Sequence, residues 1–346
     1  MIKRRHAFMI VQSLLGVGLL VAWLLMVDLQ MVAATLRQAK WFPVLLAAGL
    51  MISSGMVRVL RWRIVLRPIC WPPYMELWFI NSVAGLVNFV IPLRTAEVAK
   101  SVLLKQKRRI PIAASLPTVA IDRVLDLVAV LALGASGAVL GVRLGEDLLG
   151  VFMMGGVLLL GFVALVVVAN RASLRVTAIA GRILPRRMKE ATRRKIIRSV
   201  ELGLQIFTRV GRQRRDLILL LGLSLFAALL DVAAFALLFA SLGFALPPEV
   251  AVTGYSLFML TVLVPAAPGY VGSMEAFGSL VFVALGVGKE MAASAILLNH
   301  ALTAVLLGAT GSLGLWLLRA RGKAMVRSVV TMEEATPASA PATAEV

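Results

Sequence analysis

Residues 88–100 place an amide, a helix breaker, a cation and an anion inside a long apolar region. Pro92 removes a backbone donor, so a helix must break or begin there. Arg94 and Glu97 lie three residues apart, which puts them on one face of a helix that starts near Pro92. A charge at the bilayer centre is unfavourable by about 2.5–3.5 kcal/mol, so such charges tend to be paired and functional. Two interpretations follow: a polar binding site that includes Asn88, or the end of a membrane helix whose arginine reaches the surface.

A second polar break interrupts the apolar region of residues 250–287. Its glycines permit positive φ and a close approach of the backbone to a ligand or helix. A helix that begins near Gly272 or Ser273 would point free N–H groups and its positive dipole end into the site, which favours an anionic group such as a lipid phosphate. The alternative is that the glycines only allow close helix packing. The candidate residues of this break are Pro268, Gly269, Gly272, Ser273 and Glu275, the last of which mirrors Glu97.

Three ionisable groups lie close together near the start of another apolar segment, residues 117–140. Asp122 and Asp126 share a helix face, and Arg123 is adjacent. We expect them either to form a network with Arg94 and Glu97 or to be a structural ion-pair cluster at the interface.

Two more places carry polar groups within apolar segments. Asn299 and His300 correspond in position to Asp122 and Arg123, and the histidine is either a hydrogen bonder in packing or a proton relay. Asp231 lies in the middle of a span, so it is either the partner of a membrane cation or a coupling-ion or proton site.

The composition is that of a polytopic membrane protein. Of 346 residues, 60% are hydrophobic and 15% are charged, and the mean hydropathy is +0.93; a soluble domain carries about 25% charged residues. The net charge is +19, but the placement of the basic residues indicates topology rather than nucleic-acid binding. One cysteine and two histidines exclude an internal disulfide and Cys- or His-rich metal sites, and we expect no cofactor.

The positive-inside rule orders the apolar segments. It assigns Arg58 and Arg61 to the cytoplasmic side, and it requires residues 71–100 and 250–287 to be re-entrant hairpins that enter from opposite sides. We predict an all-α integral membrane protein with about six transmembrane helices and two such hairpins, arranged as an inverted repeat with both termini cytoplasmic. The expected segments are a first helix with an external loop (1–41), the first repeat (42–140), a connecting helix (141–170), a basic cytoplasmic segment (171–216), the second repeat (217–320) and a disordered tail (321–346).

A basic amphipathic helix is predicted within residues 188–210, where apolar residues recur at helical spacing among arginines and lysines. Such a helix suits an anionic inner leaflet. The alternative is a cytoplasmic linker helix whose charge only fixes the topology.

Three motifs in order resemble the membrane domain of bacterial lysylphosphatidylglycerol synthases and the stand-alone, flippase-like proteins built from that domain. They are Asn88…Pro92-x-Arg94-x-x-Glu97, Asp122-Arg123-x-x-Asp126 and Pro268-Gly-x-x-Gly272-x-x-Glu275. The resemblance covers about residues 5–320, and it implies movement of an anionic or modified phospholipid, or of a polyprenyl- or hopanoid-linked lipid, between the leaflets of a bacterial inner membrane. The aminoacyl-transferase domain of the full-length synthases is not expected here, so lysine transfer is not carried over. Two departures are Thr95-Ala96, where the family usually has Ala-Gly, and Tyr270, where a second Gly is usual.

Our leading hypothesis is a lipid flippase without catalytic residues, in which Arg94 holds the phosphate while Glu97 and Glu275 balance charge or bind an amine. The alternatives are an integral-membrane lipid-modifying enzyme using Glu97, Asp122 and His300 as acid/base groups, and a scaffold in lipid or cell-envelope synthesis. The expected protein partner is either a second copy of the chain or a lipid-synthesis enzyme.

Overall fold

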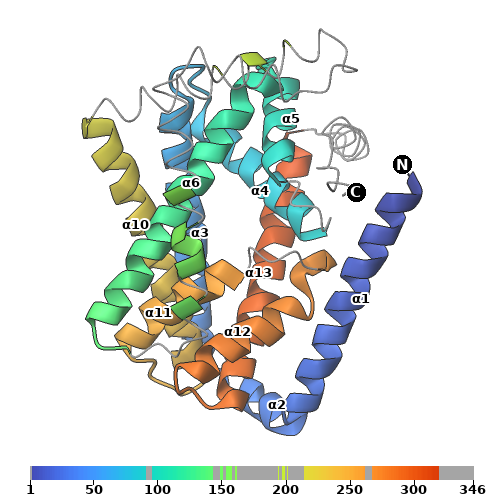
Figure 1. Cartoon of the computed structure of the whole chain (residues 1–346), viewed down its shortest axis with the longest axis vertical. Coiled ribbons are helices and arrows are strands. Elements are labelled where there is room, and N and C mark those ends of the chain that lie inside the picture. Colours follow the sequence, from blue (N-terminus) through green and yellow to red (C-terminus); the bar gives the residue numbers. More distant parts are fainter. Residues whose placement is uncertain are drawn as a thin grey trace, which may run out of the picture.

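The computed structural model describes residues 2–90, 96–142, 149–150, 153–157, 160–161, 194, 197–198, 201, 214–261 and 267–318. Most of these residues are helical, and no strand occurs among them. Figure 1 shows the helices as an elongated bundle. They are α1 (Ile2–Met26), α2 (Leu29–Arg37), α3 (Trp41–Leu66), α4 (Tyr74–Val90), α5 (Ala96–Arg108), α6 (Ile112–Val139), α10 (Arg214–Ser241), α11 (Pro248–Thr261), the 3-10 turn η1 (Pro268–Tyr270), α12 (Ser273–Ala284) and α13 (Lys289–Leu317).

Three of the described helices, α3, α10 and α13, are long and apolar enough to cross a membrane. A fourth span results if α2 and the part of α1 from Leu14 onward are one crossing, bent by 85°. Helix α6 has 28 residues but is not among these spans, and the charged residues Asp122, Arg123 and Asp126 lie within it. The protein is therefore an all-helical, multi-pass membrane protein.

Helix α6 begins at Ile112, before the apolar segment 117–140 that the sequence indicates, so Pro117 lies inside the helix. The proline removes a single intrahelical hydrogen bond. Next to it, the Thr118 hydroxyl donates to the Ser115 carbonyl at 2.6 Å. Because only one bond is lost near the start of a long helix, the helix continues through the proline.

Two apolar cores lie toward opposite ends of the bundle. The first core joins α3, α4, α5 and the beginning of α6, and it includes Trp62, Leu77 and Leu103. The second joins α6, α10, α11, α12 and α13, and it includes Phe239, Tyr255 and Phe282. In Figure 1 the pair α4 and α5 lies in the upper half and the pair α11 and α12 in the lower half.

Helix α1 lies along one side of the bundle and contacts α12. At this contact, a Cβ added to Gly272 would lie 1.9 Å from the Gly16 carbonyl oxygen. Further along, the Trp23 indole N–H donates to the Ser279 hydroxyl at 3.1 Å. The two backbones can approach so closely only because both positions are glycine.

Candidate functional site

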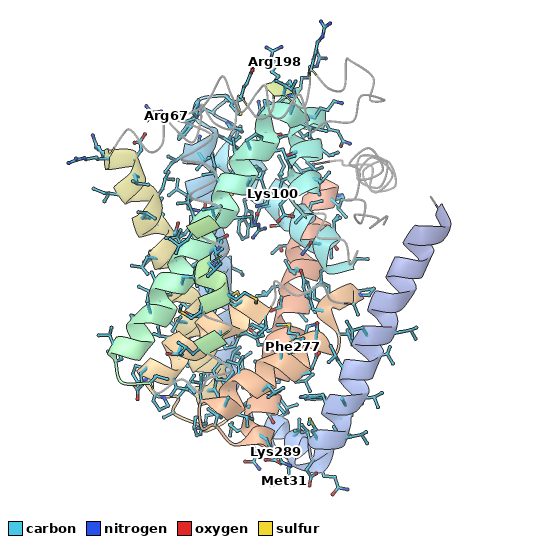
Figure 2. All side chains as sticks on the ribbon, in the orientation of Figure 1. Met31, Arg67, Lys100, Arg198, Phe277 and Lys289 are labelled. Carbon is cyan, nitrogen blue, oxygen red and sulfur yellow. The ribbon has the colours of Figure 1, made fainter. Side chains whose placement is uncertain are left out.

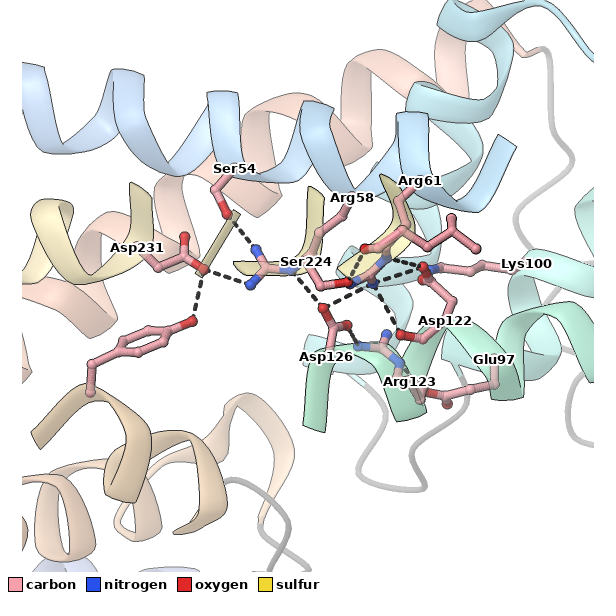
Figure 3. Close-up of polar contacts among 12 residues, drawn as sticks. Ser54, Arg58, Arg61, Glu97, Lys100, Asp122, Arg123, Asp126, Ser224 and Asp231 are labelled. Carbon is pink, nitrogen blue, oxygen red and sulfur yellow. Dashed lines mark hydrogen bonds and ion pairs between the residues drawn. The ribbon is translucent and has the colours of Figure 1, made fainter. Parts of the chain in front are cut away.

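Charged side chains from α3, α5, α6 and α10 form a continuous network, shown in Figure 3. Arg58 of α3 joins two helices: its Nη2 lies 2.6 Å from Asp231 Oδ2 of α10, and its Nε lies 3.2 Å from Asp126 Oδ1 of α6. Its Nη1 also donates to the Ser54 hydroxyl one turn earlier on the same helix. Asp231 accepts a further hydrogen bond of 2.8 Å from the Tyr255 hydroxyl. Arg58 is therefore bound on three sides.

Arg61, one turn after Arg58, is fully buried. Its Nε and Nη2 lie 2.8 and 2.7 Å from Asp122 Oδ1, and Nη2 also lies 2.9 Å from Asp126 Oδ1. Nη1 donates to the Ser224 hydroxyl of α10 at 2.8 Å. This guanidinium holds α3, α6 and α10 together.

Two further cations, Arg123 and Lys100, extend the network toward α5. Arg123 Nε donates to Glu97 Oε1 at 2.9 Å. Lys100 is 3% exposed, and its Nζ lies 3.8 Å from Asp122 Oδ2 and 5.0 Å from the centre of the Trp62 ring. Neither contact of Lys100 is a hydrogen bond of normal length, so its ammonium group retains donor capacity.

The network has no net charge when its members are ionised. Its cations are Arg58, Arg61, Lys100 and Arg123, and its anions are Glu97, Asp122, Asp126 and Asp231. Burial of a lone charge is strongly unfavourable, whereas paired and hydrogen-bonded charges compensate one another. This balance explains how so many ionisable groups can lie inside an apolar bundle.

The structure brings together Glu97, Asp122, Arg123 and Asp126, which the sequence had singled out. Arg58 and Arg61 were not predicted to be members, because the positive-inside rule assigned both to the cytoplasmic side. A signal was present: the two arginines lie three residues apart on one helix face, and the embedded carboxylates required partners.

The second polar break has the expected helix start, since α12 begins at Ser273. Gly269 and Gly272 have φ of +70° and +81°, which glycine adopts without strain. Glu275 turns back to its own helix, where Oε2 accepts the Gly272 N–H at 2.8 Å, and Oε1 contacts His300 Nδ1 of α13. One of the N–H groups predicted for an anion is thus already bound by Glu275. Of the two readings of Gly272, its contact with Gly16 of α1 supports close packing.

A direct hydrogen bond joins the two polar breaks. The Asn88 amide donates to the Tyr270 hydroxyl at 2.6 Å. Tyr270 itself has a φ of +59°, a conformation that is unfavourable for a bulky side chain. The departure from glycine at this position therefore supplies the group that binds Asn88.

Two cavities with shared walls lie along the network. The smaller, of about 250 Å³, is lined by Lys100, Asp122 and polar residues of α4, among others. The larger, of about 680 Å³, is lined mainly by apolar side chains such as Val130, Phe235 and Phe258. Both are bordered by Met51, Arg58, Gly85, Asn88, Arg123, Asp126, Thr303 and Leu307. A chamber that contains Lys100 and Asp122 therefore adjoins a mostly apolar one, with Arg58, Arg123 and Asp126 at the boundary.

Several predicted features lie outside the described residues. These include Pro92 and Arg94, and nearly all of the basic segment 188–210. Pro268 begins η1, and Asn299 lines the larger cavity. The three groups proposed for an acid/base enzyme are not brought together as a set, because Glu97 and Asp122 bind cations of the network whereas His300 binds Glu275.

The described helices thus carry a charge network beside a two-part cavity, within a multi-pass membrane protein. A family model described as the lysylphosphatidylglycerol synthase TM region matches residues 9–311. The chain belongs to this family, which gives it a role related to membrane lipids. No curated protein and no solved structure matches the chain.

Proposed function

We propose that this protein is a flippase that moves a lipid with an anionic headgroup between the leaflets of a bacterial inner membrane. The observation that carries the proposal is the pair of adjoining cavities. A lipid has the same division, because its headgroup is charged and its chains are apolar. The smaller cavity suits the headgroup, and the larger one suits the proximal part of the acyl chains.

Lys100 is the residue to which we assign the headgroup phosphate. Arg58 and Arg61 donate hydrogen bonds to carboxylates and serines, whereas Lys100 Nζ has one ionic contact at 3.8 Å among the described residues. It also lines the smaller cavity. An ammonium group has three donors and binds phosphate as a point charge. Arg94 remains a second predicted phosphate ligand from the sequence.

The arrangement of the helices supports the topology that transport requires. The pairs α4–α5 and α11–α12 lie in opposite halves of the bundle (Figure 1), and each pair is divided by a break that the sequence predicts to be the tip of a re-entrant hairpin. Figure 2 shows Arg67 and Arg198 at one end and Lys289 at the other. We propose an inverted repeat whose Arg67 end is cytoplasmic.

A transfer assay in proteoliposomes tests the function. Wild-type protein should move a fluorescent phosphatidylglycerol between leaflets faster than a zwitterionic phosphatidylcholine. A hydrogen bond to a charged group contributes about 1.5–3 kcal/mol, so Lys100→Met should slow transfer of the anionic lipid by about 10- to 150-fold.

The matched control is Lys105→Met, which removes an exposed lysine from the same helix. It should transfer the lipid at the wild-type rate. Equal transfer rates for the two variants would show that Lys100 does not bind the headgroup. Wild-type protein that transfers no lipid in either direction would refute the proposal that the protein is a flippase. A new lipid species made by the purified protein would favour the enzyme instead.

A further inference from the structure

The imidazole of His300 lies between two hydrogen-bond acceptors. Its Nδ1 faces the Glu275 carboxyl group, and its Nε2 lies 2.7 Å from the Gly269 carbonyl oxygen. Both residues are buried, with exposures of 7% and 3% for His300 and Glu275. A backbone carbonyl only accepts, and an ionised carboxylate only accepts. A neutral imidazole has a single N–H, so it satisfies one of these partners and directs a lone pair at the other.

The observed geometry therefore requires one more proton than a neutral imidazole beside a carboxylate. Either the imidazole carries a proton on both nitrogens, or Glu275 carries one and donates it to Nδ1 while Nε2–H bonds Gly269. In both arrangements every partner is satisfied, including the Gly272 N–H that donates to Glu275 Oε2 at 2.8 Å. When the proton leaves, the remaining N–H bonds the carboxylate, since hydrogen bonds to charged acceptors are the stronger. The Nε2 lone pair then faces the Gly269 carbonyl, and this contact is lost.

Loss of the hydrogen bond between His300 Nε2 and the Gly269 carbonyl would affect the wall of the larger cavity. Each of the three residues adjoins a wall residue in the chain: His300 follows Asn299, Gly269 precedes Tyr270, and Glu275 follows Met274. The Phe89 ring of α4 packs edge-on against the imidazole at 5.8 Å and lines the same cavity. A change in the Gly269 contact is thus passed directly to Tyr270, and through its hydroxyl to Asn88.

Among the described residues, the other charged groups on helices packed against α13 have their own partners or stand at helix ends. Arg58 and Arg61 of α3 bind the network, Arg63 donates to the Pro72 carbonyl, Glu76 of α4 binds Arg108, and Asp231 of α10 binds Arg58. Asp28 caps α2. The remaining charged residues lie in end turns: Arg37 of α2, Arg214, Arg215 and Asp216 of α10, and Lys289 and Glu290 of α13. Tyr270 is bonded to Asn88. Glu275 is therefore the ionic partner of His300.

We propose that the Glu275–His300 pair is a proton-binding site that fixes the turn 268–272 against α13 and releases it when the proton is lost. The site is occupied at low pH, so the turn is fixed there and freed as the pH rises. The inference extends the proposed flippase, in which the turn borders the cavity, by supplying a proton as the coupling ion. Asp231, the earlier candidate for that role, is instead bonded by Arg58 and Tyr255.

Hydrogen–deuterium exchange of the purified full-length protein in nanodiscs tests the proposal without any transported lipid. Exchange of the amides of residues 269–276, divided by the intrinsic rate at each pH, should rise at least tenfold as the pH is raised from about pH 5 until the pair has lost its proton. The variant Glu275→Gln supplies a neutral donor to Nδ1 and an acceptor for the Gly272 N–H. It should therefore keep the low exchange of the protonated wild type at every pH.

Two further variants give the fast-exchange limit and a control for the pH dependence. His300→Leu removes both donors and should exchange at the fast rate throughout the pH range, whereas the control Glu290→Gln should keep the wild-type pH dependence. Equal pH dependence in wild type and Glu275→Gln would overturn the proposal, as would wild-type exchange that does not change with pH. Because no lipid transfer enters this measurement, its outcome is independent of the flippase assay.

Discussion

Replacing Asp122 with asparagine decides whether the charge network is a structural element as well as a cavity wall. The substitution keeps the shape but changes the net charge of the network from zero to +1. Arg61, which is fully buried, would lose the negative charge of the acceptor in its two shortest ionic contacts and keep the carboxylate of Asp126 at 2.9 Å. Removing one partner of a buried pair is unfavourable by about 3–5 kcal/mol, and the remaining aspartate places the loss near about 3 kcal/mol.

The assay is the thermal unfolding midpoint of the purified protein in detergent. At about 2–4 °C per kcal/mol for a domain of 150–250 residues, Asp122→Asn should lower the midpoint by about 6–12 °C. The control, Glu76→Gln, breaks the more exposed pair with Arg108, whose contact is 2.6 Å, and should change the free energy of unfolding by less than about 1 kcal/mol.

A second variant separates charge from packing. Arg61→Leu combined with Asp122→Asn restores a net charge of zero and should recover at least half of the lost stability. Two outcomes would show that the balance of charge does not stabilise the network. One is that Asp122→Asn unfolds at the same temperature as Glu76→Gln. The other is that the double variant loses more free energy of unfolding than the sum of the losses in Asp122→Asn and Arg61→Leu.

The remaining predictions concern packing and topology. Gly272→Ala should destabilise the protein by about 2–5 kcal/mol, of which the left-handed backbone contributes about 1–2 and overpacking about 1–3 kcal/mol. The overpacking arises because the added Cβ would lie 1.9 Å from the Gly16 carbonyl oxygen. The control is Gly308→Ala, where no atom lies within 4 Å of the added Cβ, and equal thermal midpoints for the two variants would contradict the tight contact. For topology, Cys70, whose thiol has a pKa raised by burial, is first replaced by serine, and single cysteines are placed at the exposed positions Trp71, Gln106, Ala245 and Gly288. An impermeant thiol reagent should reach the first two from the cytoplasm and the last two from outside, whereas labelling of one flanking pair from opposite sides would show a full crossing in place of a hairpin.

The local sequence was sufficient to predict the class of protein and many of the elements. Long apolar runs predicted α3, α10 and α13 because a membrane span needs about 20 apolar residues. Glycine spacing predicted the start of α12 at Ser273, because the positive φ of the preceding residue is a local property. The spacing of Asp122, Arg123 and Asp126 indicated an ionic cluster, either with Arg94 and Glu97 or at the interface, and the structure pairs Arg123 with Glu97.

The pairing of these groups was decided only by the tertiary structure. Arg58 and Arg61 have the sequence context of surface arginines, and only the approach of α3 to α6 and α10 turns them into the centre of the network. The contact of Gly272 with Gly16 and the placement of His300 between Glu275 and Gly269 also join segments far apart in the chain. Periodicity and composition report which face of a helix is polar, but the partner of a buried charge depends on which helices pack together, and that is set by the whole core.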